Sequence, residues 1–260
     1  MIAEELNPQS AVIHHKLPEQ QRSSEVHAVL QKLRHILISR RKSTSGVAPF
    51  AGVSSYWENR YAAGGTSGAG SAGRLADFKA RVLNDFVEQH DIKRVIEFGC
   101  GDGSQLALAR YPQYVGVDVS PTAIELCRSR FAGNPDMRFF HASERPRFRA
   151  RYDLVLSLDV ILHLVDDRIY QEYMEDLRGH ASKYIIVYSS NFDDDGGSAR
   201  APHVRHRRFS PFFDSLADEW RLAEVIKNPH SFDPDDQQNT SRADFYIYAN
   251  ITESMPEAEI

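Results

Sequence analysis

A turn with three alternating glycines follows a hydrophobic stretch in "RVIEFGCGDGSQL", Arg94 to Leu106. Glu97 lies in the hydrophobic stretch, two residues before Gly99, and Gly101 follows. Glycines allow a ligand to approach the backbone closely, and the N–H groups of a helix that begins at such a turn face the ligand. A strand, a glycine turn and a helix in this order predict a ligand site at the carboxyl end of a parallel sheet.

The charges around this turn indicate which ligand it binds. A dinucleotide fingerprint that starts at Gly99 needs a third glycine at position 104, where the chain has Ser104. The Glu97 carboxylate suits an ammonium group and repels a pyrophosphate. Asp118 ends the next hydrophobic stretch, "YVGVDV", and is placed to accept hydrogen bonds from a ribose diol. Two acids beside a neutral turn therefore indicate a cationic nucleoside amino acid.

These segments resemble a known family. "VIEFGCGDGSQL" and "YVGVDVSPTAIELCRSRF" are similar to motif I and the following acidic strand of the class I S-adenosylmethionine-dependent methyltransferases, and "YDLVLSLDVILHL" resembles their fourth-strand motif. The resemblance extends from Tyr56 to Asn250. It implies an α/β fold with a Rossmann-like, seven-stranded, doubly wound sheet, S-adenosylmethionine as the cofactor, and methyl transfer as the reaction.

The resemblance also implies roles for single residues. Gly99 and Gly101 would line the methionine and ribose of the cofactor, and Glu97 would face its amino acid end. Asp118 would hold the ribose hydroxyls, and Val119 would pack on the adenine.

The adenine contact departs from the family pattern. Many relatives have an acid near the adenine amino group, whereas this chain reads "FFHASE". We expect Ser143 or Glu144 to substitute for that acid.

His163, in "SLDVILHLVDD", is the candidate catalytic residue. It follows the predicted fourth strand, beside the expected position of the transferred methyl group. Methyl transfer is an in-line displacement, so the enzyme aligns the acceptor and, for a hydroxyl acceptor, removes a proton. Histidine titrates in the right range for this task. We predict that His163 is a general base; the alternative is a packing residue.

The segment "SSNFDDDGGSARAPHVRHRRFS" is longer than a plain connection requires and ends in a basic cluster. Long segments at the binding edge of such sheets usually determine specificity. Arginine offers forked donors that suit a carboxylate or phosphate. We therefore predict an acceptor with an anionic group; the alternative is a solvated basic turn. The residues assigned to the acceptor are Asn191, His203, Arg205, His206 and Arg207.

A magnesium site is a further possibility that the sequence does not favour. Asp159, Asn191 and Asp193 could supply oxygen ligands. Their spacing is unlike that of the catechol-type methyltransferases, and "DDDGG" also reads as a plain polar turn. We predict no metal.

Alternating elements must position these residues. Unbroken apolar strands predict a parallel sheet covered on both faces. The last two strands, "WRLAEVIK" and "ADFYIYAN", have no helix between them and predict an antiparallel hairpin. Helices are expected at 75–89, after Ser104, and at 121–131, 166–180 and 211–218, and the other strands are "RVIEF", "YVGVDV", "MRFFHA", "DLVLSL" and "YIIVYSS".

The chain before this sheet divides into two parts. Residues 1–46 are predicted to be a helical extension and linker, because apolar residues between Glu19 and Lys42 recur at helical spacing. That helix could pack on its own domain, form a homodimer contact, or bind an anionic surface through its basic end.

Residues 47–73 are a glycine-rich lid or linker. Tyr56, Trp57 and Tyr61 favour a lid, because a linker has no use for aromatic anchors. We expect this lid to close over the cofactor, with Tyr61 in contact with it. Residues 74–252 form the methyltransferase domain.

Composition limits the partners and the compartment. The chain has 260 residues with 31 basic and 36 acidic side chains, so its net charge gives no reason to expect a nucleic acid partner. No signal peptide and no membrane span is indicated, and the chain is predicted to be soluble, intracellular and cytoplasmic. Cys100 and Cys127 are expected to be free thiols.

The sequence therefore predicts an S-adenosylmethionine-dependent methyltransferase that acts on a small acceptor. O-methylation of a compound with an anionic group, in a glycan or specialised-metabolite pathway, is favoured. The alternatives are N-methylation, a macromolecular acceptor, and a catalytically silent binding subunit with the same fold. "SLDV" at the fourth strand does not match the N/D-P-P-Y/F/W motif of adenine N-methyltransferases.

Overall fold

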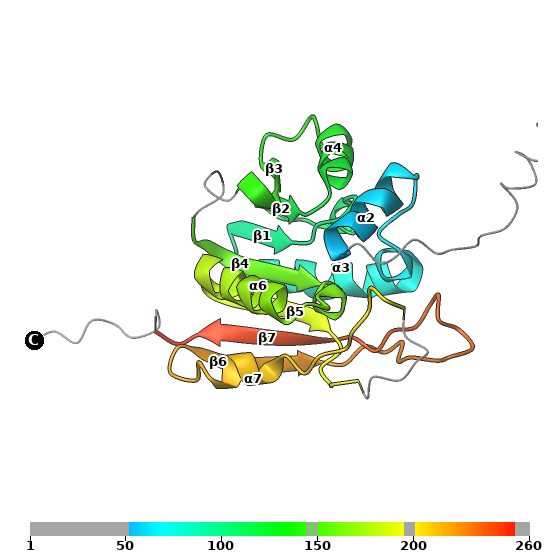
Figure 1. Cartoon of the computed structure of the whole chain (residues 1–260). Helices are drawn as coiled ribbons and strands as arrows, with labels where there is room; N and C mark the ends of the chain where they lie inside the picture. Colours follow the sequence, from blue (N-terminus) through cyan, green and yellow to red (C-terminus); the bar gives the residue numbers. More distant parts are fainter. Residues whose placement is uncertain (1–51, 145–146, 148–149, 195–200, 253–260) are drawn as a thin grey trace, which may run out of the picture. The chain divides into compact units, whose positions relative to one another are not determined.

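The computed structural model describes residues 52–144, 147, 150–194 and 201–252 (Figure 1). The amphipathic helix predicted between Glu19 and Lys42, and the homodimer contact that it could form, lie outside the described residues. The predicted boundary between residues 46 and 47 also lies outside them and stays a prediction.

The described residues form a seven-stranded sheet with the strand order β3-β2-β1-β4-β5-β7-β6. The first five strands are parallel, and β7 runs antiparallel to both β5 and β6. This confirms the predicted fold class and the terminal antiparallel hairpin. The strands are β1 (Arg94–Phe98), β2 (Gln113–Asp118), β3 (Met137–His141), β4 (Tyr152–Leu158), β5 (Ala181–Ser189), β6 (Trp220–Ile226) and β7 (Asp244–Asn250).

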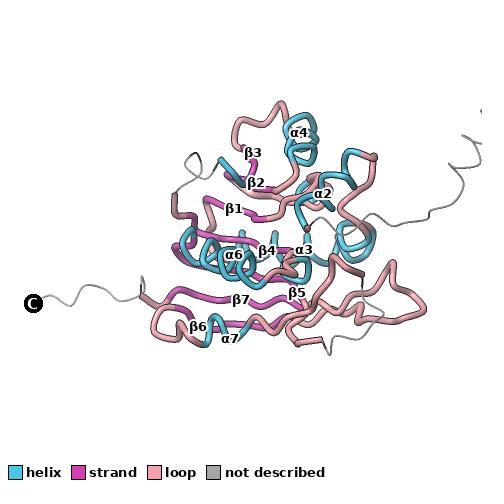
Figure 2. The backbone as a smooth tube through the Cα atoms, in the orientation of Figure 1, coloured by secondary structure: helices cyan, strands magenta, loops and turns pink. Residues whose placement is uncertain are grey.

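Helices cover both faces of this sheet. The helix α6 begins where the Asp166 side chain accepts a hydrogen bond from Ile169 N, and its apolar residues at helical spacing are buried. Figure 2 shows α6 in front of the sheet. The α-helices are α2 (Val53–Ala62), α3 (Gly73–Gln89), α4 (Pro121–Arg130), α6 (Asp167–His180) and α7 (Ser210–Asp214), with short 3-10 turns η1 (Ala69–Ser71), η2 (Leu106–Leu108), η3 (Ala142–Glu144) and η4 (Ile161–His163).

The core has two layers because successive strand residues point to opposite faces. Val95 and Leu154 join the cluster under α3, whereas Ile96 and Val155 join the cluster under α6. All four side chains are fully buried. Burial on both faces explains why these strands are unbroken apolar runs.

The helix predicted after Ser104 is wrong: only the short turn η2 forms there. The Asn84 side chain of α3 takes the backbone groups that a helix would use, donating to Leu108 O and accepting from Arg110 N. Pro112 follows, and a proline disfavours helical backbone in the residue before it. No α-helix therefore begins at the glycine turn.

The segment between residues 47 and 73 is partly helical. The helix α2 carries Tyr56, Trp57 and Tyr61. The Glu58 carboxylate on the same helix accepts hydrogen bonds from Ser120 Oγ, Thr122 N and Thr122 Oγ1 at 2.6, 3.1 and 2.6 Å. These bonds hold α2 against the first turn of α4 (Figure 1). None of the helices in the described ranges combines the length and apolarity needed to cross a bilayer.

Candidate active site

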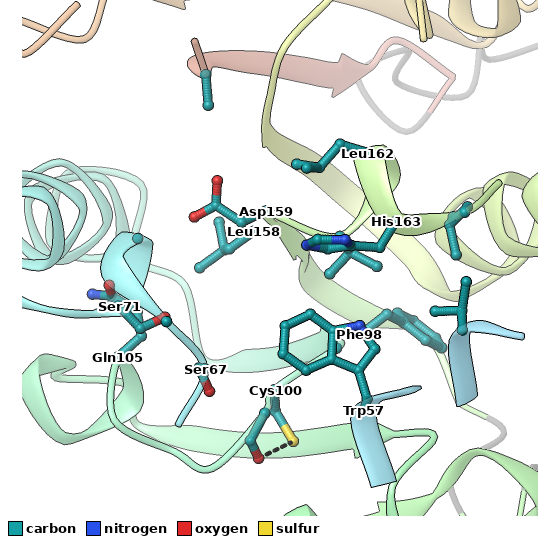
Figure 3. A pocket seen from close by; sticks show the side chains of 18 of the residues that line it. Trp57, Ser67, Ser71, Phe98, Cys100, Gln105, Leu158, Asp159, Leu162 and His163 are labelled. Carbon is teal, nitrogen blue, oxygen red and sulfur yellow. Dashed lines mark hydrogen bonds between the residues drawn. The ribbon is translucent and has the colours of Figure 1, made fainter. Parts of the chain in front are cut away.

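A cavity of about 550 Å³ lies at the carboxyl ends of β1, β2 and β4. Its size suits a small-molecule ligand. Residues from α2, the glycine-rich segment, α3, the turn after β1, the segment after β4 and the β6–β7 connection line it (Figure 3). Parts of the chain that are far apart in sequence therefore share one site.

The glycine turn lines this cavity in a conformation that only glycine adopts easily. Gly99 and Gly101 have φ angles of +86° and +56°. A Cβ atom would lie 2.4 Å from Val160 Cγ2 at the first position and 2.4 Å from Ser67 Oγ at the second. Both glycines are therefore required by the backbone and by the close packing around them.

Asp118 fixes the glycine turn to the end of β2. Its Oδ2 accepts from Gly101 N and its Oδ1 from Ser120 N, both at 2.9 Å. The side chain lines the cavity with Val119. Burial raises the Asp118 pKa, although the backbone donors oppose this shift. Asp118, which is predicted to bind the ribose, therefore also stabilises the glycine turn.

Glu97 and Gln105 place acceptor oxygens at the same end of the cavity. Glu97 is buried, its Oε2 accepts from Tyr114 Oη at 2.6 Å, and burial raises its pKa to about 7. Gln105 donates from Nε2 to Ala76 O, but no described residue donates to its buried Oε1. Since buried acceptors are normally satisfied, this end suits a ligand that carries donors.

The glycine-rich segment closes over the turn through contacts that the sequence did not indicate. Tyr61 Oη lies 3.0 Å from Ser67 Oγ, and Ser67 donates from N and Oγ to Asp102 at 3.1 and 2.8 Å. Tyr61 is buried and lines the cavity. No sequence signal marked Ser67 or Asp102 beyond their place in glycine-rich stretches.

The predicted adenine contacts lie elsewhere. Ser143 Oγ is 2.7 Å from His141 Nδ1, and Glu144 accepts from His141 N. Neither side chain is among the cavity-lining residues; Ala142 is. The Ser143 hydroxyl and the Glu144 carboxylate both serve the local turn after β3, which corrects the expectation that one of them reaches the adenine.

His163 lines the cavity on its other side, after β4. Its Nδ1 lies 2.9 Å from His203 O, a carbonyl that can only accept, so Nδ1 carries the proton and Nε2 keeps a free lone pair. The ring meets the Trp57 ring edge-on with centroids 5.0 Å apart. Burial lowers the His163 pKa, which favours the neutral imidazole.

His203 and His206 also line the cavity. His203 stacks on Tyr56 with centroids 3.8 Å apart and ring planes 14° apart, and burial lowers its pKa. His206 Nδ1 lies 2.7 Å from Ser190 Oγ. The structure therefore brings three of the predicted histidines to one site.

The predicted arginine ligands do not line it. Arg205 Nη1 donates to Val165 O and Asp167 Oδ1 at 3.2 and 2.9 Å. Arg207 donates to Leu164 O, Val165 O and Asp167 Oδ1 at 2.8, 2.9 and 2.5 Å. Both guanidinium groups instead tie their segment to the start of α6, which corrects their assignment to the acceptor.

Asn191 is likewise structural. Its Oδ1 accepts from Phe209 N at 2.9 Å and from Ser210 N at 3.2 Å, and it does not line the cavity. The amide thus satisfies the free backbone donors at the start of α7.

An Arg207→Met protein should be less stable by about 1–2 kcal/mol, because a nearly buried guanidinium loses several hydrogen bonds while its partner Asp167 remains solvated. Urea unfolding measures this change. Arg208→Met, at an exposed position, is the matched control and should change the unfolding free energy little. Equal stability of the two variants would contradict the structural role.

The three side chains considered as magnesium ligands each bind a different group of the protein. Asp159 pairs with Lys79 Nζ, and Asp193 accepts from Arg208 N. Within the described ranges, no group of three or more His, Cys, Asp or Glu side chains is arranged to hold a metal ion.

Three cationic side chains that the sequence analysis did not single out line the cavity: Arg60, Lys79 and Arg242. Arg60 donates from Nε to Thr66 O, and the Arg242 guanidinium lies 3.6 Å from the Phe232 ring centroid. Lys79 left one signal, since it interrupts the buried face of α3.

Comparison with known proteins found a similarity to methyltransferases. Residues 95–183 match the family profile described as methyltransferase domain. A search of curated proteins found no match.

Solved structures resemble the whole sheet. Magnesium protoporphyrin IX methyltransferase from Synechocystis PCC 6803, with bound S-adenosylhomocysteine (SAH), aligns with a TM-score of 0.55 and 14% identity over 76% of this chain and 97% of that one. N-methyltransferase NodS from Bradyrhizobium japonicum WM9, in complex with SAH, gives 0.55 and 14% over 76% and 98%. An O-methyltransferase family protein from Burkholderia thailandensis gives 0.51 and 16% over 68% and 56%. At these identities the likeness concerns the fold.

Proposed function

We infer that this chain, which carries a methyltransferase domain with the class I fold, uses S-adenosylmethionine to methylate a hydroxyl oxygen of a small acceptor with an anionic group, in a glycan or specialised-metabolite pathway. The observation that carries this proposal is the position of His163. His163 lines the same cavity as the glycine turn and Asp118, and its Nε2 is unprotonated.

The residues at the glycine turn fit the cofactor. Gly99 and Gly101 give the turn the positive φ angles with which its backbone lines the cavity, and the Glu97 carboxylate and Gln105 Oε1 offer acceptors to an ammonium group. Asp118 and Val119 are assigned to the ribose and adenine. When bound, the cofactor supplies a methyl group on a sulfonium.

The other side of the cavity prepares the acceptor. His163 Nε2 takes the proton of the acceptor hydroxyl as the oxygen becomes nucleophilic, and the hydrogen bond from Nδ1 to His203 O holds the ring in this tautomer. Trp57 and Tyr56 pack on the two histidines and exclude water from this wall.

An anionic group on the acceptor needs a cation that faces the cavity. Arg205 and Arg207 are engaged elsewhere, so we assign this role to Arg242. Its guanidinium stacks on Phe232 and makes no ion pair or hydrogen bond with the described residues. A stacked guanidinium keeps its forked donors available for a carboxylate or phosphate.

Incubation with methyl-labelled S-adenosylmethionine and a panel of hydroxylated and amino carboxylates and phosphates tests the proposal. We expect label in an acid-stable methyl ether. If label appeared only in methylamines, the result would favour N-methylation over O-methylation. If calorimetry detected no SAH binding, the result would favour the alternative of a catalytically silent binding subunit.

Binding of SAH should release a proton near pH 7. The pKa of Glu97 is about 7 before binding, and an ammonium group beside it favours the carboxylate, so the proton leaves when the ligand binds. The affinity should therefore fall as the pH drops below 7. Calorimetry in buffers of different ionisation enthalpy measures the released proton, and Glu97→Gln should abolish it. Proton uptake at this pH would contradict the assignment.

We propose that the segment predicted at 47–73 acts as a lid, of which residues 53–71 belong to the part that the structure describes. The bonds of Ser67 to Asp102 join this segment to the glycine turn, so SAH should stabilise both. Hydrogen exchange in this segment should slow on SAH binding, by up to about 100-fold at 100 times Kd. Glu58→Gln should speed the exchange without ligand, because it weakens the contact with α4. Equal protection with and without SAH would make the segment a static wall.

A further inference from the structure

Lys79 and Asp159 form an ion pair in the cavity wall that the steps above do not use. Lys79 Nζ lies 2.7 Å from Asp159 Oδ2, and the side chains are 1% and 27% exposed. Both residues line the cavity. A buried ion pair rarely stabilises a protein more than apolar residues of the same size would. Its place in the wall of a ligand site therefore suggests a role in binding.

The carboxylate of this pair is held from three sides. Asp159 has φ +58°, an uncommon conformation for a residue other than glycine, and its N donates to Tyr188 O on β5 at 2.8 Å. On another side, a Cβ on Gly70 would lie 2.8 Å from Asp159 Oδ2. Lys79 itself packs over the Tyr188 ring. The end of β4, the glycine-rich segment and α3 thus fix one carboxylate.

The second oxygen of this carboxylate remains available. Lys79 bonds to Oδ2, and no hydrogen bond from the part of the chain that the structure describes reaches Oδ1. Figure 3 shows Asp159 and His163 on the same side of the open space, with Trp57 facing them from α2. The two groups are also close enough for the Asp159 charge to favour the protonated form of His163. One small ligand can therefore contact both.

We propose that Asp159 Oδ1 accepts a hydrogen bond from a second hydroxyl group of the acceptor, so that the acceptor is a polyhydroxylated compound such as a sugar acid. One hydroxyl faces His163 and another is held by Asp159, while Lys79 keeps the carboxylate charged and oriented. Lys79 is thus a positioning residue. This inference rests on the proposed function, because it concerns the acceptor of that reaction.

The test compares two probes on the SAH-saturated protein by ligand-observed NMR. D-glucuronate carries several hydroxyls, and cis-3-hydroxycyclohexanecarboxylate has a similar ring and one hydroxyl. Wild-type protein should bind glucuronate about 10- to 100-fold more tightly, the scale of a hydrogen bond to a charged group. The Lys79→Met, Asp159→Ala double variant, which leaves no unpaired buried charge, should lose most of this preference.

Two further variants separate positioning from structure. Lys79→Met alone should reduce the preference and Lys79→Arg should restore it, whereas a merely structural lysine would leave the ratio of the two affinities unchanged. Glu172→Gln, at a cavity-lining carboxylate paired with Arg168, is the matched control and should not change the ratio.

Calorimetry with SAH keeps this test distinct from the proposed function. The Lys79 charge also lowers the Glu97 pKa, so SAH affinity is measured well above pH 7, where Glu97 is ionised. There it should stay within about threefold of wild type in the double variant, a difference below 1 kcal/mol. Equal binding of the probes to wild type, absence of binding by both, or a preference retained in the double variant would overturn the proposal. A parallel loss of SAH affinity would do so as well, since it would place the pair in the cofactor site. Absence of SAH binding to wild type would instead defeat the proposed function.

Discussion

A His163→Asn enzyme is expected to lose about 10²- to 10⁴-fold in kcat, the usual contribution of a general base. The asparagine amide can still donate to His203 O, so the segment after β4 keeps its hydrogen bond while the base at Nε2 is gone. Initial rates with an acceptor found in the labelled screen measure the loss. SAH affinity should change little, because His163 lies across the cavity from the glycine turn.

The wild-type pH profile provides an independent check. Burial lowers the His163 pKa below its ordinary value of 6.5, so the neutral base predominates at pH 7. The rate should rise with pH through that lowered pKa and reach a plateau by neutral pH; the His163→Asn enzyme should lack this rise. His203→Phe, which can keep the stack on Tyr56, is the control and should retain most of kcat. If His163→Asn kept a normal kcat, the enzyme would act by alignment alone or through another base.

An Asp118→Asn protein should bind SAH about 10- to 100-fold more weakly, which corresponds to about 1.5–3 kcal/mol for a lost charged acceptor. The carboxylate accepts from both Gly101 N and Ser120 N, and an amide can accept from only one of them while its own N–H₂ faces the other. The variant therefore loses a ribose acceptor and loosens the glycine turn. Calorimetry with SAH measures the affinity.

Ser143→Ala is the matched control for Asp118→Asn. Its hydroxyl bonds to His141 outside the cavity, so its removal should leave the SAH affinity unchanged. Thermal unfolding of both variants separates weaker binding from a general loss of structure. Unchanged affinity in a folded Asp118→Asn protein would remove Asp118 from the cofactor site.

The predictions that the structure confirms rest on patterns within short, continuous segments of the sequence. Unbroken apolar runs such as "RVIEF" and "DLVLSL" predicted strands buried on both faces, because this pattern follows from side chains alternating across a sheet. Gly99 and Gly101 marked the turn after β1, which the structure forms with positive φ at both residues, and Asp118 ended the neighbouring strand. Each of these features depends mainly on its own segment.

Contacts between distant segments decided what the sequence analysis missed. The helix after Ser104 failed because Asn84, on another element, bonds to the backbone at Leu108 and Arg110. An arginine-rich segment indicates donors but not their direction: Arg207 turns to Asp167, 40 positions earlier.

The sequence by itself thus determined the succession of strands along the chain, the glycine turn and the acids beside it, because these follow from local patterns of polarity and backbone freedom. Only the tertiary structure decided which charged side chains face the cavity. Lys79 enters the site because Asp159, 80 positions later, compensates its burial there. A charged side chain goes where a partner offsets its desolvation, and folding alone brings that partner within reach.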